Sequence, residues 1–188
     1  MLPWGVAGLA LVALLALIAG QFFGSRGTPE IGDATLVSPG AGRAPDISAM
    51  SPQERADRLF NHVMQLSSDG KLDSAKFFAP MAMASIEAIT PATPHTRYDL
   101  GLVALVIGET ATAAAQADTI LRDAPKHLLG LVLAARAAGA RRDDSARRGF
   151  EKRLLAAEPG ETARALPEYV DHANDIRSAV AAAREAKK

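Results

Sequence analysis

The chain has 188 residues, with 21 basic and 21 acidic side chains and no cysteine. A net charge of zero argues against nucleic acid as the main ligand, because phosphate binding requires a basic surplus. The lack of cysteine excludes disulfides, thiolate metal sites and thiol nucleophiles. Aromatic residues make up only 5% of the chain, and alanine is frequent, which favours closely packed helices over a sheet.

The first segment of the chain predicts a membrane anchor. Residues 2–23 read LPWGVAGLALVALLALIAGQFF and carry no charge. As a helix this run would span about 33 Å, close to the ~30 Å of a bilayer core. We therefore expect a single transmembrane helix over residues 1–24. The alternative is a cleaved signal peptide, but no Lys or Arg precedes Arg26 and the end of the run offers a poor cleavage site.

Two further features of this segment bear on its surroundings. Ala16, Gly20 and Gly24 recur every four residues, a spacing that allows a second transmembrane helix to pack closely. The alternative is that a segment rich in Ala and Gly contains such a pattern by chance. Arg26 is the only charge near the helix ends, and the positive-inside rule alone would place the following domain in the cytoplasm.

A linker and a helix start come next. Residues 25–50 are rich in Pro and Gly with scattered apolar positions, which predicts a flexible tether. The sequence Ser51-Pro52-Gln53-Glu54 then has Ser at the N-cap, Pro at N1 and Glu at N3, which predicts a capping box. Residues 51–188 are expected to form the folded domain.

Helical periodicity dominates this domain, and no segment alternates with period two. After the first helix, which we expect to end near Gly70, further helices are expected at 74–89, 96–107, 110–122, 125–138, 144–157 and 167–186. Pro80 lies inside the first of these runs, so that helix should kink or begin late. The fold class predicted is all-α.

Similar turn-plus-helix starts recur along the domain. GKLDSA, GETATA and RRDDSA end at Ala75, Ala113 and Ala146, spacings of 38 and 33 residues, as in a solenoid of helical hairpins. The chain resembles the tetratricopeptide repeat family, with Leu100-Gly101, Ala113 and Pro125 in one unit and Ala146-x3-Phe150 in the next. The aromatic residues typical of the family are replaced, for example by Ala104. The resemblance implies units at about 56–89, 94–127 and 128–159.

Packing expectations follow from residue size. Gly101 and Ala113 should let the two helices of one hairpin approach closely. The bulky side chains of Ile120, Leu121, Leu128, Leu131 and Val132 should fill the space between hairpins. The run 167–186 has one narrow apolar stripe and charged opposite faces, which predicts a helix that caps the end of the solenoid.

The sequence contains no recognisable catalytic motif. The four histidines, His62, His95, His127 and His172, are never four residues apart from one another, so no metal site is expected. Nucleophile-elbow, P-loop and dinucleotide-binding motifs do not occur. We therefore expect neither an enzyme nor a bound cofactor or small-molecule substrate.

Two surfaces are candidates for protein binding. In the resembled family, the first helix of each unit lines a concave groove for peptides. The corresponding positions are Asp57, Phe60, Met64, His95, Tyr98, Leu102, Leu105, Leu129, Val132 and Arg136. The alternative is that several of them are packed under the capping helix. The second candidate is a basic docking patch of Arg141, Arg142, Arg147 and Arg148, which could equally be a solvated helix face with ordinary ion pairs.

Together these features predict a membrane-anchored interaction scaffold. We expect an accessory, structural or assembly subunit of a membrane protein complex, respiratory or photosynthetic, with other membrane subunits and the bilayer as partners. A periplasmic, chaperone-like adaptor that binds peptides transiently is the alternative. The resemblance to anchored envelope proteins favours a bacterial inner membrane location with a periplasmic domain, against the indication from Arg26.

Overall fold

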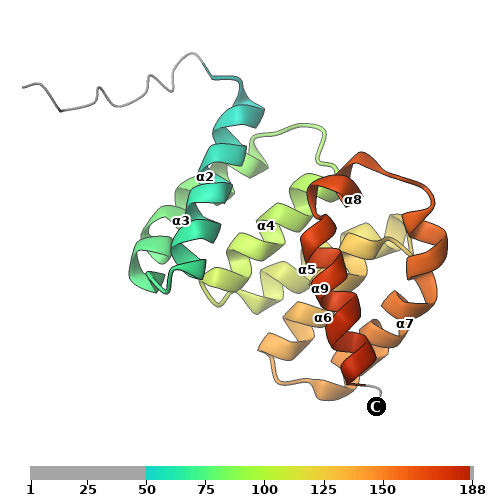
Figure 1. Cartoon of the computed structure of the whole chain (residues 1–188). Coiled ribbons are helices and arrows are strands. Elements are labelled where there is room, and N and C mark those ends of the chain that lie inside the picture. Colours follow the sequence, from blue (N-terminus) through green and yellow to red (C-terminus); the bar gives the residue numbers. More distant parts are fainter. Residues whose placement is uncertain (1–49, 187–188) are drawn as a thin grey trace, which may run out of the picture. The chain divides into compact units, whose positions relative to one another are not determined.

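The computed structural model describes residues 50–186, which form eight helices and no strand (Figure 1). The all-α fold class is therefore confirmed for this part of the chain. The helices are α2 (Pro52–Ser68), α3 (Leu72–Glu87), α4 (Pro94–Val106), α5 (Thr110–Asp123), α6 (Leu128–Ala140), α7 (Asp144–Thr162), α8 (Pro167–Asp171) and α9 (Ala173–Glu185).

Consecutive helices pair as hairpins. α2 packs on α3, α4 on α5 and α6 on α7, and each hairpin also contacts the next. The first helices of the hairpins touch one another, α2 with α4 and α4 with α6. α9 lies beside α6 and α7 (Figure 1). The three hairpins fall within a few residues of the three units expected from the sequence, while their membership of a repeat family stays a prediction.

The buried side chains form two clusters that meet at α4. The smaller one lies between the first hairpin and α4 and comprises Ala56, Val63, Ala75, Ala79, Ala82, Ile86, Leu100 and Val103. The larger one joins α4 to the remaining helices and is richest in leucine on α6, where Leu128, Leu129, Leu131 and Leu133 are almost fully buried. The side chains expected to fill the space between hairpins lie in this cluster, which confirms that expectation.

The close approach at Gly101 differs from the expected one. A Cβ at this position would overlap the side chain of Leu133 on α6. Gly101 therefore allows α4 to approach the next hairpin, not its own partner α5. The expectation was wrong because a small residue can serve either neighbour, and sequence spacing does not distinguish them.

Some local sequence signals locate the helix boundaries and others do not. The capping box at α2 is confirmed: Ser51 Oγ accepts from the backbone N–H of Glu54 at 3.2 Å, and Glu54 Oε2 accepts from Ser51 N at 2.8 Å. Two other prolines, in contrast, do not mark boundaries. Pro80 lies inside α3 and Pro159 inside α7. Both are exposed, so water can satisfy the carbonyl that loses its helical partner.

The expected capping helix is divided into two pieces. α8 ends at Asp171 and α9 begins at Ala173, with His172 between them at φ −105° and ψ 25°. The apolar stripe is as expected, since Tyr169, Ile176 and Val180 are buried. The prediction of one continuous helix was wrong at His172, and this break turns the His172 side chain into the interior.

Among the described residues, no helix is long and apolar enough to span a bilayer. The expected anchor over 1–24, its Ala16, Gly20 and Gly24 stripe, and most of the linker over 25–50 lie outside the described part of the chain.

Candidate functional site in an acidic cleft

A cleft of about 800 Å³ opens where α2, the α3–α4 loop, α4 and α8 meet. Among the described residues that line it are four carboxyl groups, those of Asp57, Asp99, Glu168 and Asp171, and no lysine or arginine. Apolar surface is contributed by Phe60, Ile89, Pro94 and Pro167. The cleft is therefore suited to a cationic ligand that also carries apolar groups.

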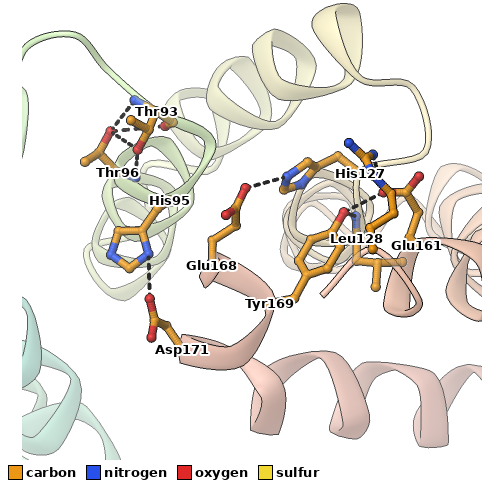
Figure 2. A network of polar contacts seen from close by, with 10 residues as sticks. Thr93, His95, Thr96, His127, Leu128, Glu161, Glu168, Tyr169 and Asp171 are labelled. Atoms are coloured by element: carbon orange, nitrogen blue, oxygen red, sulfur yellow. Dashed lines mark hydrogen bonds and ion pairs between the residues drawn. The ribbon is translucent and has the colours of Figure 1, made fainter. Parts of the chain in front are cut away.

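The start of α4 positions two of the polar residues. Thr93 is the N-cap: its Oγ1 accepts from Thr96 N at 3.2 Å, and Thr96 Oγ1 accepts from Thr93 N at 2.9 Å (Figure 2). Pro94 at N1 adds a preset helical φ. His95 and Asp99 are four residues apart in the helix that follows, so their side chains share one face.

Three side chains converge at the base of the cleft. His95 Nε2 lies 3.3 Å from Asp99 Oδ2, and His172 Nε2 lies 3.3 Å from Asp99 Oδ1. The ligand atoms of the three residues all lie within 4.8 Å of one another. Asp99 and His172 are buried, whereas the His95 side chain retains 26% of its exposure. We call these three residues the His–Asp cluster.

A second layer of carboxylates surrounds the cluster. His95 Nδ1 faces Asp171 Oδ2 at 3.8 Å (Figure 2), and His172 Nδ1 faces Asp175 Oδ2 at 3.8 Å. Asp175 in turn accepts a 2.7 Å hydrogen bond from Arg136 Nη2 on α6. Each imidazole thus presents one nitrogen to Asp99 and the other to an outer carboxylate.

Burial sets the protonation of the cluster. Loss of water raises the pKa of Asp99 to about 8, and the neighbouring charges of Asp57, Asp175 and Asp171 act in the same direction. Burial lowers the pKa of His172, with the nearby His95 contributing. Burial therefore opposes a formal ion pair between Asp99 and His172.

A separate polar network fixes α8 against α6 and α7 (Figure 2). His127 Nε2 lies 3.3 Å from Glu168 Oε1. The Tyr169 hydroxyl accepts from Leu128 N at 3.1 Å and donates to Glu161 Oε2 at 2.8 Å. This network, which we call the α8 latch, holds the segment that delivers Asp171 and His172 to the cleft.

The ten groove positions expected from the sequence are divided by the structure. Asp57, Phe60 and His95 line the cleft. Tyr98, Leu102, Leu129 and Val132 are buried in the larger core cluster, so in this structure they are not an accessible surface. Met64 and Leu105 pack partly buried against the same cluster, and Arg136 is engaged by Asp175. The described part of the expected groove is thus open only at its α2–α4 end, because α8 and α9 cover the rest.

The expected basic patch is partly neutralised within its own helix. Arg147 contacts Asp144 at 3.1 Å and Glu151 at 2.7 Å. Arg141 donates to a backbone carbonyl on α5, and Arg142 adopts φ 60° in the turn before α7. Arg148 is exposed. As a docking site the patch remains a prediction.

The spacing of the histidines relative to one another does not predict the cluster, because the third member of the cluster is a carboxyl group. The His95-x3-Asp99 spacing is visible in the sequence and identifies two of its three residues. His172 lies far along the chain, and only the α8–α9 break brings it to Asp99. No local sequence pattern predicts the contact between His172 and Asp99.

No protein-family model, curated protein or solved structure matches the chain. The function proposed below therefore rests on the contacts, burial and charge of the described residues, together with the sequence of the N-terminal segment.

Proposed function

We propose that the chain is a membrane-anchored scaffold whose acidic cleft binds a basic segment of a partner protein. Its role would be that of an accessory, structural or assembly subunit of a membrane protein complex, respiratory or photosynthetic. The observation that carries this proposal is the composition of the cleft, whose lining within residues 50–186 has four carboxyl groups and no lysine or arginine.

The cleft also has the right form for a segment of chain. Its volume of about 800 Å³ accommodates a few side chains, in the range of typical ligand pockets. Phe60, Ile89 and the two prolines offer apolar contact beside the carboxyl groups. Charge complementarity of this kind gives specificity and speeds association more than it adds raw affinity, which suits recognition of one partner among many.

The membrane part of the proposal comes from the uncharged run over residues 2–23. A flexible tether over 25–50 would let the helical domain reach across a neighbouring subunit. We place the domain in the periplasm of a bacterial inner membrane. Protease digestion of spheroplasts tests this: the domain should be cleaved, and a protected domain would place it in the cytoplasm.

Site-specific photocrosslinking in native membranes tests whether a partner protein binds in the cleft. A photoreactive residue replaces exposed Asn61, which lines the cleft, or exposed Ala111 on α5, which does not. We expect one discrete adduct from position 61 and not from position 111, with a lower yield at high salt and in Asp171→Asn, because the attraction is electrostatic.

The outcomes separate the candidates. An adduct whose partner also co-purifies stoichiometrically in mild detergent supports the subunit role. Several substoichiometric adducts support the alternative, a periplasmic chaperone-like adaptor that holds peptides transiently. Equal labelling from both positions, or none from position 61, would overturn the cleft as the binding site.

A further inference from the structure

We propose that His95, Asp99 and His172 form a binding site for a divalent transition-metal ion of the zinc type. This site would lie at the base of the cleft and join α4 to the α8–α9 joint. The inference stands apart from the proposed partner, because it concerns side chains that face one another whether or not a protein segment is bound.

The spacing of the ligand atoms fits such an ion. Zinc binds imidazole nitrogen and carboxylate oxygen at about 2.0–2.2 Å, so two neighbouring ligand atoms of a tetrahedral site lie ~3.3 Å apart. The two Nε2 atoms lie 3.3 Å from oxygens of the same Asp99 carboxyl group, and all ligand atoms fit within 4.8 Å.

Hydrogen bonding gives an independent indication. Asp99 Oδ1 and His172 Nε2 are buried and face each other, yet neither has a hydrogen-bond partner among the described residues. Both residues are more than nine-tenths buried. Unsatisfied buried polar atoms are rare and costly in native proteins, and each one calls for an explanation. A shared cation satisfies both lone pairs at once.

The outer carboxylates are arranged as around known metal-bound histidines. A ligating imidazole usually directs its second nitrogen to a carboxylate, which fixes the ring and increases its basicity. Asp171 faces Nδ1 of His95 and Asp175 faces Nδ1 of His172, each at 3.8 Å. Arg136 holds Asp175 in place at 2.7 Å. A carboxylate thus lies near the second nitrogen of each histidine, at a distance longer than a hydrogen bond.

The ligand set decides the class of metal. Two imidazoles and one carboxylate suit zinc, cobalt, nickel, iron or copper, whereas magnesium and calcium prefer oxygen ligands alone. The partly exposed His95 borders the open cleft, which gives the ion a path of entry. A fourth position remains for water or for a group of a bound partner, as in zinc sites with three protein ligands.

Metal titration of the purified full-length protein in detergent tests the site. After treatment with chelator and dialysis against Zn²⁺, we expect one zinc per chain by elemental analysis and a rise in Tm. Co²⁺ should bind to the same residues and give the visible absorption of a four-coordinate site. His95→Gln is the principal variant because its side chain is the most exposed of the three, so folding should be least affected.

His95→Gln, His172→Gln and Asp99→Asn should each lower zinc affinity by at least tenfold. His62→Gln, on the exposed face of α2, should retain the full stoichiometry, and circular dichroism verifies that each variant folds. Failure of the wild-type protein to retain zinc, or retention by a folded His95→Gln variant equal to that of wild type, would overturn the site. The cluster would then be a structural polar contact only.

Discussion

At the scale of single residues, the polar side chains whose burial costs the most free energy lie together in the His–Asp cluster. A carboxyl group and an imidazole are buried against each other at Asp99 and His172, in reach of further carboxylates from Asp57, Asp171 and Asp175. Burying such groups without satisfied hydrogen bonds destabilises a fold. Stability alone would favour apolar residues here, so the cluster is where we expect function and stability to oppose each other.

The substitution Asp99→Asn tests whether the cluster lowers the stability of the fold. In chelator at pH 8, the variant should be more stable than the wild-type protein by about 1–2 kcal/mol, because it removes a carboxyl group whose ionisation is opposed by burial, and its amide can donate to His172 Nε2. Urea unfolding followed by circular dichroism gives the difference. With Zn²⁺ added, the order should reverse, since the wild-type protein binds the ion more tightly than the variant and gains more stability from it. A variant less stable than wild type in chelator would contradict this account.

Glycine at position 101 is needed for space. A Cβ there would overlap the Leu133 side chain, which is fully buried. We expect Gly101→Ala to lower the free energy of unfolding by about 1–3 kcal/mol through overpacking. In the described part of the chain, nothing lies within 4 Å of a Cβ built at Gly149 on α7. Gly149→Ala should therefore raise the free energy of unfolding by about 0.5–1 kcal/mol through helix propensity. Chemical denaturation of the two variants checks both signs.

At the scale of elements, the joint between α8 and α9 makes the site. α8 has only five residues, too few to be stable alone, and it is held by the α8 latch. Tyr169 is central to this latch because its hydroxyl bonds both the first turn of α6 and Glu161. The position of His172 thus depends on hydrogen bonds made a few residues earlier in the chain.

Removing the Tyr169 hydroxyl should therefore weaken both the fold and the site. Tyr169→Phe leaves the Leu128 N–H without its partner and removes one of the two donors to Glu161 Oε2, which we expect to cost about 1–2 kcal/mol in unfolding experiments. Arg164→Ala removes the other, more exposed partner of Glu161 and should cost less than about 0.5 kcal/mol. Equal losses of unfolding free energy in the two variants would contradict the central place of the Tyr169 hydroxyl in the α8 latch.

The latch also predicts a dependence on pH. Burial is the largest effect on His127 and lowers its pKa, while Glu168 and Glu161 oppose it and Arg164 adds to it. The unfolded chain, with a histidine pKa of about 6.5, then binds a proton more readily than the folded chain. The stability contributed by neutral His127 is therefore full above pH 6.5 and is lost as the pH falls below that value.

His127→Gln should remove part of the loss of folding stability at low pH. Thermal unfolding of both proteins between pH 7.5 and 5 gives the two curves, and the difference in slope should be at most about 1.4 kcal/mol per pH unit, the value for one proton. Parallel curves would show that His127 does not titrate with unfolding.

The elements themselves were largely predictable, and the site was not. Apolar periodicity and capping signals such as Ser51 with Glu54 located the helices and the hairpin pairing, because these are local properties. Proline misled at Pro80 and Pro159, where an exposed position tolerates it. The cluster depends on the break at His172 and on contacts between distant segments. Neither the break nor these contacts can be predicted from local sequence patterns.

At the scale of the whole molecule, helices pack mostly on their neighbours in the chain. Such arrangements have stabilities that are approximately sums over adjacent units. The expected groove illustrates the limit of sequence reasoning at this scale. Its positions on α4 and α6 were located correctly on the first helices of their hairpins, but the last two helices cover them, as the burial of Tyr98 and Leu129 shows.

The division of the interior into two clusters has a mechanical consequence. The first hairpin shares a small core with Leu100 and Val103 on one side of α4, while Tyr98, Leu102 and Ala104 of the same helix belong to the larger core. A pulling force that enters through residue 50 acts on α2 first. It would peel away the first hairpin and uncover Leu100 and Val103, while the helices from α4 onward remain joined by their own cluster.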